Sequence, residues 1–256
     1  MEETDSMKVL ICGIGGRMGR EVALLALNGC RGAEAVAGFD VLPVDTREFP
    51  SYTDWNAVRE TPDCIIDFSH HVGTDALLDF AVRRHIPVVL ATTGHTEEEL
   101  SRIREASEST AIFFSANMSV GVALLAELAK QVAKAMPDAE IEIIEKHHNR
   151  KLDSPSGTAL LLAEAIKTVR RGAKLIFGRH GQAKRDPDEI GIHAIRMGNI
   201  VGDHEIIVGT DSQTITLRHE AHSRALFAEG AIAAAAFLCG QPAGLYNMQD
   251  LLKDPD

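Results

Sequence analysis

The sequence lacks an excess of positive charge and a long apolar run, and each absence excludes a class of partner. Its net charge is −11 over 256 residues. A surface of that sign repels nucleic acid and anionic membranes, so we expect neither as a partner. The longest apolar candidate, "GAIAAAAFLCG", falls well short of the roughly 20 residues that span a bilayer, and its alanines are typical of a packed helix.

Cysteine is also scarce. The four cysteines, Cys12, Cys30, Cys64 and Cys239, form no C-x-x-C pair, and we interpret them as buried thiols in a reducing compartment rather than as zinc ligands. We therefore predict no bound metal. The first residues, "MEETDS", are acidic and lack the basic segment that opens a secretory signal peptide. These observations favour a cytoplasmic protein.

The first half of the chain alternates short apolar strands with helical patterns. Strands are predicted within 7–12, 33–40, 63–69, 86–94 and 111–117, and segments whose apolar residues recur at helical spacing lie between several of them. Such alternation predicts right-handed βαβ units. The fold class is therefore α/β, with a doubly wound parallel sheet of the Rossmann type.

The pattern changes after Asn117. Helices are predicted at 120–136 and 158–171, a half-exposed strand begins at residue 139 and runs out around Glu145, and three strands broken by turns follow within 190–223. These elements predict a second, α+β substrate-binding domain with an open mixed sheet. We expect a dinucleotide-binding domain at 7–118, completed by the C-terminal helices of 225–256, and a substrate-binding and oligomerisation domain at 119–224.

A glycine-rich turn, "GIGGRMG" at 13–19, follows the first strand and precedes a helix. Gly13, Gly16 and Gly19, with Gly15 beside them, allow a tight turn and close approach of the backbone to a pyrophosphate. The helix N-terminus offers amide groups to the phosphates, and Arg17 adds positive charge. This context predicts a dinucleotide site; the alternative is a glycine turn required only for packing.

Asp40 ends the second predicted strand, about 20 residues after the turn, where a carboxylate accepts hydrogen bonds from the adenine ribose. It would repel the 2′-phosphate of NADPH, and "VLPVD" after it contains no arginine. We therefore expect NADH to be preferred, with NADPH as a second cofactor; the alternative is a solvated strand end. Phe68, Ser69, Thr92 and Thr93 follow later strands and are candidates to line the nicotinamide, or are ordinary loop residues.

A second cluster of polar residues is "KHHNRKLDSPSGTA" at 146–159. His147 and His148 face opposite sides of an extended strand, so one can act as an acid while the other binds. Gly157 and Thr158 are predicted at a helix N-terminus, which binds anions, and we expect Pro155 in the first turn of that helix. With Lys151 they predict a pocket for a small dianion that awaits a proton.

Three alternatives compete with this interpretation of 146–159. Histidine pairs in loops usually lie at the surface, and a lysine is usually a solvated charge. A zinc pair lacks nearby cysteines or an H-E-x-x-H helix. Ser156 resembles a nucleophile, but "SPSGTA" lacks the G-x-S-x-G elbow of a serine hydrolase.

The two motifs together resemble the dihydrodipicolinate reductase family. The glycine turn is similar to its G-x-x-G-R-M-G signature, and 145–159 is similar to E-x-H-H-x-x-K-x-D-x-P-S-G-T-A; "DFS", "TTG", "ANMSVGV" and "RMGNIVGDH" are similar to further family segments in the same order. The resemblance covers 7–252. One departure is Ala91, where some members have glycine.

The resemblance implies roles for individual residues. His147 takes the general-acid position, Lys151 the second proton-donor position, and His148, Gly157 and Thr158 the substrate positions. The positions implied at the dinucleotide are Gly13, Ile14, Gly15, Gly16, Arg17, Met18, Asp40, Ala91, Thr92, Thr93, Ser115, Ala116, Asn117 and Met118, to which the strand-edge argument adds Phe68.

The family implies an oxidoreductase that reduces 4-hydroxy-tetrahydrodipicolinate to tetrahydrodipicolinate with NAD(P)H, in lysine and diaminopimelate biosynthesis, as a homotetramer assembled through the substrate-domain sheets. Two rivals stay open. An NAD-dependent amino-acid dehydrogenase such as aspartate dehydrogenase would use the same scaffold, and a redox-sensing regulator would bind NADH without turnover. The intact 145–159 motif speaks against both.

Overall fold

A computed structural model describes residues 6–253. The chain divides into two compact units. The first comprises the described residues up to Ser119 together with those from Ala225 onward, and the second comprises Val120–Arg224. Both the parallel α/β sheet and the separate mixed sheet predicted from the sequence are confirmed.

The first unit is built on a seven-stranded sheet in the order β12-β6-β5-β4-β1-β2-β3. Every neighbouring pair is parallel. The chain proceeds from β1 through β2 to β3 on one side and from β4 through β5 to β6 on the other, so the strand order reverses between β1 and β4. Open α/β sheets bind ligands at such a reversal, beyond the carboxyl ends of the strands. The strands are β1 (Met7–Cys12), β2 (Ala33–Phe39), β3 (Ser51–Tyr52), β4 (Cys64–Asp67), β5 (Val88–Leu90), β6 (Ala111–Phe114) and β12 (Gly244–Tyr246).

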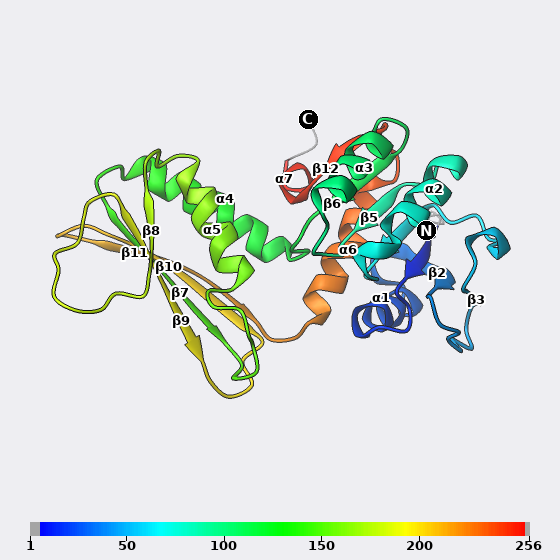
Figure 1. Cartoon of the computed structure of the whole chain (residues 1–256), viewed down its shortest axis with the longest axis horizontal. Coiled ribbons are helices and arrows are strands. Elements are labelled where there is room, and N and C mark those ends of the chain that lie inside the picture. The colour runs from blue at the N-terminus through cyan, green and yellow to red at the C-terminus, as the bar shows by residue number, and fades with distance from the viewer. Residues whose placement is uncertain (1–5, 254–256) are drawn as a thin grey trace, which may run out of the picture. The chain divides into compact units, whose positions relative to one another are not determined.

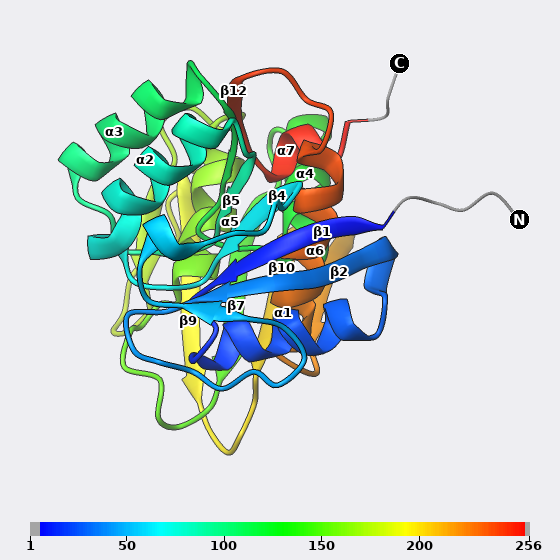
Figure 2. The same cartoon turned by 90° about the vertical axis from the view of Figure 1, so that its right-hand side faces the viewer.

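Helices cover both faces of this sheet, α2 and α3 on one and α1 and α6 on the other (Figure 2). The side chains of Leu77, Leu78 and Ile103 bury the apolar face of the first pair against the strands. Thr96 and Glu99 form a reciprocal capping box that fixes the start of α3. The helical segments are α1 (Arg17–Leu27), α2 (Thr74–Arg84), α3 (Glu97–Ser107), α6 (Ala225–Leu238) and α7 (Met248–Leu251), with 3₁₀ turns at Cys30–Gly32, Trp55–Ala57 and His71–Gly73.

The second unit is a five-stranded sheet in the order β11-β10-β7-β9-β8. β7 pairs antiparallel with β10 and parallel with β9, which makes the sheet mixed. Two helices, α4 and α5, lie on one face (Figure 1), and their alanine and leucine side chains pack on the isoleucines of the strands. The elements are α4 (Val120–Ala135), β7 (Glu140–His147), α5 (Gly157–Lys167), β8 (Lys174–Phe177), β9 (Glu189–Arg196), β10 (Gly202–Gly209) and β11 (Thr214–Ala221).

Several local predictions were wrong. β7 continues to His147 instead of ending around Glu145, because it stays paired with β9 up to Arg196. Pro155 lies before the helix, since Ser156 is the N-cap of α5. Cys30 and Cys239 are only half-buried. The strands β3, β8 and β12 were not predicted, because strands this short do not contain enough residues to show a periodic pattern.

Within residues 6–253, no helix is both long enough and apolar enough to cross a membrane.

Candidate active site

The turn after β1 requires glycine for steric reasons. Gly13 has φ of +79°, and a Cβ there would lie 2.7 Å from the carbonyl oxygen of Phe68. A Cβ on Gly19 would lie 2.2 Å from the carbonyl oxygen of Gly13, so helix α1 packs against the turn more closely than a side chain permits. The N-cap residue, Gly16, has no side chain to bond the first amides of α1. Those amides are the groups that bind phosphate at a helix N-terminus.

A cavity of about 770 Å³ opens beside this turn. The side chain of Asp40 lies in it, and its Oδ2 accepts a hydrogen bond from the backbone N–H of Gly15 at 2.9 Å. The predicted dinucleotide residues that line the cavity are Gly13, Gly15, Gly16, Asp40 and Phe68; Ser69 and Arg20 also line it. Volume, glycine turn and carboxylate together fit the adenosine and pyrophosphate parts of a nicotinamide dinucleotide.

The remaining predicted dinucleotide residues do not line this cavity. Ile14 is buried behind the turn, and Arg17 and Met18 begin α1. Ala116 is exposed and Met118 is buried. The Ser115 hydroxyl donates to the carbonyl of Asn117 at 2.8 Å and so shapes the loop after β6.

At the end of β4, a buried carboxylate that the sequence analysis missed, that of Asp67, organises the carboxyl edge of the sheet. Asp67 Oδ2 accepts from the hydroxyl of Thr92 at 2.7 Å, and Asp67 Oδ1 accepts from the hydroxyl of Ser69. The carbonyl of Asp67 accepts from the N–H of Ala91. Thr93, by contrast, is exposed. Asp67 therefore fixes the loops after β4 and β5, and the Thr92 hydroxyl is already used inside the protein.

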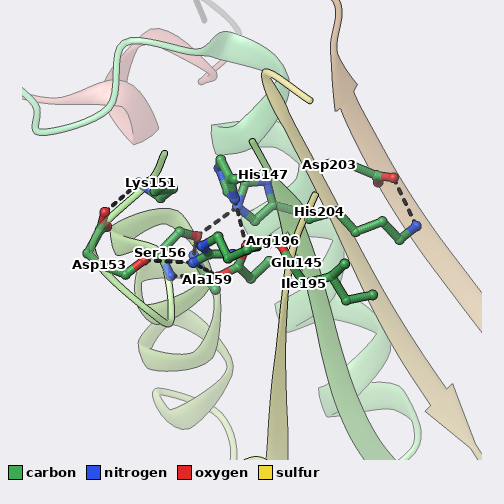
Figure 3. Close-up of polar contacts among 11 residues, drawn as sticks. Glu145, His147, Lys151, Asp153, Ser156, Ala159, Ile195, Arg196, Asp203 and His204 are labelled. Carbon is green, nitrogen blue, oxygen red and sulfur yellow. Dashed lines mark hydrogen bonds and ion pairs between the residues drawn. The ribbon is translucent and has the colours of Figure 1, made fainter. Parts of the chain in front are cut away.

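In the second unit, the end of β7 presents a buried carboxylate and imidazole side by side (Figure 3). Glu145 and His147 are two residues apart in an extended strand and therefore share a face. Glu145 is 0% exposed and His147 is 8% exposed. The distance from His147 Nδ1 to Glu145 Oε2 is 2.6 Å.

Three further donors surround the Glu145 carboxylate. Arg196 donates from both terminal nitrogens, at 2.7 Å to Oε2 and 2.6 Å to Oε1. The backbone N–H of Ser156 donates to Oε1 at 3.0 Å. Burial by itself raises the pKa of Glu145, but the hydrogen bonds from His147, Arg196 and Ser156 outweigh it and lower the pKa to about 2. Glu145 is therefore ionised at neutral pH.

Ser156 links this carboxylate to a second buried histidine. Its hydroxyl caps α5 by accepting from the N–H of Ala159 at 3.1 Å and lies 3.0 Å from His204 Nε2. The rings of His204 and His147 are 5.1 Å apart. Burial, and next the nearby His147, lower the pKa of His204 to about 4. His204 is therefore neutral near pH 7, and the buried Ser156 hydroxyl serves as the cap of α5.

Lys151 lies in the loop between β7 and α5 and binds an anion of the chain itself. Its Nζ is 2.8 Å from Asp153 Oδ1. Hydrogen bonds from Lys151 and from the N–H of Gly157 hold the pKa of Asp153 below its usual range. Lys151 and a backbone amide at the start of α5 are therefore both directed at the Asp153 carboxylate. Thr158 follows Gly157 in the first turn of α5.

His148, next to His147, has a buried ring nitrogen without a bond to any described residue. Its backbone N–H donates to Ile200 at 2.8 Å. Within the described part of the chain, the buried His148 Nδ1 has no hydrogen-bond partner. Partial burial and the charge of Arg150 lower the pKa of His148, so its ring is neutral and offers a donor or acceptor to a ligand.

Five polar residues of this site were absent from the predicted set: Glu145, Asp153, Ser156, Arg196 and His204. Three of them lie in the 145–159 motif, and Arg196 and His204 are the first and last residues of the quoted segment RMGNIVGDH, so a signal existed for all five. The alternation of β7 was enough to show that Glu145 and His147 share a face. For Arg196, nothing local indicates a partner 51 residues away.

Comparison with known proteins gives a consistent result along the whole chain. The family model for the N-terminus of dihydrodipicolinate reductase matches residues 7–118, and that for its C-terminus matches residues 121–252. The chain is 47% identical over 251 residues to the 4-hydroxy-tetrahydrodipicolinate reductase of Caldanaerobacter subterraneus subsp. tengcongensis, covering 96% of this chain and 98% of that protein. Identity to the enzyme of the same name from Clostridium tetani is 42%, covering 98% and 99%.

A solved structure is also similar. The dipicolinate-bound dihydrodipicolinate reductase from Paenisporosarcina sp. TG-14 superposes with a TM-score of 0.82 at 26% identity, covering 96% of this chain and 100% of that one.

Proposed function

This chain belongs to the dihydrodipicolinate reductase family, and on that premise we propose that His147 donates the proton in its reaction. The activity is that of a 4-hydroxy-tetrahydrodipicolinate reductase, an oxidoreductase of lysine and diaminopimelate biosynthesis that uses a nicotinamide dinucleotide. The observation that carries the assignment of roles is the segment from β7 to α5, where an imidazole, a lysine and a helix N-terminus occur within eleven residues of sequence.

The chemistry divides between the two units. When bound, the reduced nicotinamide supplies a hydride. His147 supplies the accompanying proton, since histidine is suited to that transfer near neutral pH. Lys151 is the second proton-donor candidate and also a cation for the substrate.

We assign the substrate carboxylates to the groups around the start of α5. Lys151 and the N–H of Gly157 both bind the carboxylate of Asp153. A carboxylate of the substrate therefore competes with Asp153 for these two groups. Thr158 extends this anion site along the first turn of α5. His148 contributes a neutral ring nitrogen. Dipicolinate, which the Paenisporosarcina enzyme binds, has the charge and shape that this site suits.

We assign the dinucleotide to the first unit. The amides of 15–18 bind its pyrophosphate, and Asp40 accepts from its adenine ribose. The loops that contain Phe68, Ala91 to Thr93 and Ser115 to Met118 are assigned to the nicotinamide half. Because Asp40 faces the 2′ position, NADH is preferred over NADPH.

Two properties of the whole protein complete the proposal. Ile195 is exposed, and its position in β9 places it on the face opposite Ile190 and Ile192, which are buried under the helices. An exposed apolar side chain on this open face supports assembly of a homotetramer through these sheets; light scattering on the purified protein measures its mass in solution. All four cysteines are free thiols, which favours a cytoplasmic location.

Oxidation of NADH, followed with and without freshly generated 4-hydroxy-tetrahydrodipicolinate, tests the function. The expected result is turnover that depends on this substrate and is inhibited by dipicolinate. Oxidation of aspartate with NAD would support the amino-acid dehydrogenase instead. Tight NADH binding without turnover of either substrate would support the redox sensor.

A further inference from the structure

The Glu145 carboxylate has its hydrogen-bonding capacity filled. Oε2 accepts from His147 Nδ1 and Arg196, and Oε1 accepts from Arg196 and the N–H of Ser156. Each oxygen therefore has two donors, about the full capacity of an ionised carboxylate. Glu145 is also inaccessible to solvent, so it has neither a proton to give nor a surface for substrate.

Of the groups around Glu145, only His147 can change its role. Arg196 and the backbone N–H of Ser156 donate in every protonation state relevant here. The imidazole Nδ1 donates when it carries a proton and accepts when it does not. As long as Glu145 is ionised, a bare Nδ1 would face a carboxylate lone pair, so the proton stays on Nδ1.

The other ring nitrogen is kept clear of a side chain by glycine at position 202. A Cβ added to Gly202 on β10 would lie 3.2 Å from His147 Nε2 and would crowd it. His204, the imidazole packed nearest, is bonded to Ser156 and does not share a proton with His147 in any contact of the described residues.

We propose that Glu145, held in place by Arg196, is the positioning residue of this active site: it fixes the proton of His147 on Nδ1 and makes Nε2 the nitrogen that delivers the proton. The consequence for catalysis rests on the proposed function. The tautomer of His147 does not, because it follows from the contacts of Glu145 alone.

The register of the sheet explains how the pair is held. β7 and β9 are parallel, with His147 opposite Arg196 and Glu145 opposite Ala194. Arg196 thus reaches Glu145 from the neighbouring strand, while the N-cap of α5 brings the N–H of Ser156 to the same carboxylate. Three separate elements converge on one carboxylate, which is the rigid support that a precisely oriented acid requires.

Histidine-selective ¹⁵N NMR tests the inference directly. Spectra of the wild-type chain are recorded at a pH where His147 is neutral, with its signal assigned by loss in His147→Gln. The expected wild-type signature is a protonated Nδ1 and a bare Nε2. In Glu145→Gln, the amide NH₂ replaces one carboxylate oxygen and faces two hydrogen-bond donors whichever oxygen it replaces. Only His147 Nδ1 can become an acceptor for it, so the proton should move to Nε2 and the signature should reverse. A wild-type ring protonated on Nε2 overturns the inference without any variant.

Kinetics supply the second readout. By analogy with a triad that loses its orienting carboxylate, kcat of Glu145→Gln should fall by about 10²–10⁴-fold, with a much smaller change in KM for the dicarboxylate and none in NADH affinity. Glu142→Gln is the matched control, since Glu142 lies on β7 like Glu145 and pairs with a histidine, His193 of β9, at 2.8 Å; it should leave both kcat and the His147 signature unchanged. An equal loss of kcat in both variants overturns the inference.

Arg196→Lys guards against misfolding of the Glu145 variant. It keeps the positive charge but cannot hold both oxygens, so His147 should keep its tautomer while kcat falls less than in Glu145→Gln. A chain that shows the expected tautomer but no reductase activity would refute the proposed function and leave the tautomer assignment intact. If wild type and Glu145→Gln have opposite tautomers of His147 but equal turnover, this inference is refuted and the proposed function is not.

Discussion

The two candidate binding regions of this molecule are built from different materials. At the turn of residues 13–19 the backbone makes the site, and glycines are needed because side chains would collide with Phe68 and Gly13. At the end of β7 side chains make the site, and a buried carboxylate organises an arginine, a histidine and a helix terminus. A dinucleotide pyrophosphate is a common ligand that backbone amides bind, whereas proton transfer needs a side chain of suitable acidity.

Because of this difference, the two regions are sensitive to different kinds of substitution. In the turn, the sensitive change is the addition of atoms, because there is no space for them. In the β7 region, the sensitive change is the removal of a charge or proton donor, because the partners left behind are buried.

The largest effect is expected from His147→Gln, which removes the proposed proton donor while keeping a polar side chain. Turnover should fall by about 10²–10⁴-fold, the usual contribution of a positioned general acid. NADH affinity, measured by fluorescence titration, should stay unchanged since the residues proposed to bind the dinucleotide are in the other unit. Turnover within a few-fold of wild type would show that the role belongs to another residue.

Acid should destabilise the protein through Glu145. Its pKa is lowered from 4.5 unfolded to about 2 folded, so the stabilisation is present above pH about 4.5 and is lost as pH falls toward 2. A shift of this size corresponds to roughly 3 kcal/mol. Urea unfolding between pH 6 and 3 should show the loss, and Glu145→Gln should flatten that slope. A slope that survives the substitution would place the acid sensitivity in other carboxylates.

Lys151→Ala should weaken both rate and dicarboxylate binding, because it removes a cation that holds a carboxylate. A charged hydrogen bond contributes about 1.5–3 kcal/mol, so the inhibition constant of dipicolinate should rise by about 10- to 100-fold. NADH titration provides the control. An equal loss of NADH affinity would move Lys151 to the cofactor.

Gly19→Ala tests the sterically restricted region. The new Cβ would lie 2.2 Å from the Gly13 carbonyl oxygen, which forces the turn and α1 apart at a cost of about 1–3 kcal/mol. NADH affinity should fall and the dipicolinate site should keep its affinity. Gly172→Ala is a control for a glycine with open space around it, and because its φ is +92° it reports backbone strain alone. Unchanged NADH affinity in Gly19→Ala would contradict close packing as the reason for this glycine.

Asp40→Ser should have the smallest effect and concerns cofactor choice. Repulsion between Asp40 and a 2′-phosphate in a partly wet site costs on the order of 1–3 kcal/mol, so wild type should favour NADH over NADPH in kcat/KM by about 10- to 100-fold. The substitution should reduce or reverse that gap. Arg20 lines the same cavity, and a wild-type preference for NADPH would show that this arginine outweighs Asp40.

The sequence by itself determined the elements and the type of each domain. Alternating strands and helices up to Asn117 specify a parallel sheet, and the change of period after it specifies the mixed sheet, because periodicity reflects which face of an element is buried. The glycine turn was equally local, since its signal is glycine spacing between a predicted strand and a predicted helix. His147, Lys151 and the start of α5 lie within eleven residues and were predicted together.

The tertiary structure alone decided which distant side chains meet. Arg196 reaches Glu145 only because β9 lies beside β7 with Arg196 opposite His147. His204 enters the same site because β10 borders β7 on its other side. Asp67 bonds Thr92 because β4 and β5 end at the same edge. Strand order and register depend on the packing of the whole sheet, and a one-residue slip would turn each of these side chains to the opposite face, so no local pattern could specify these contacts.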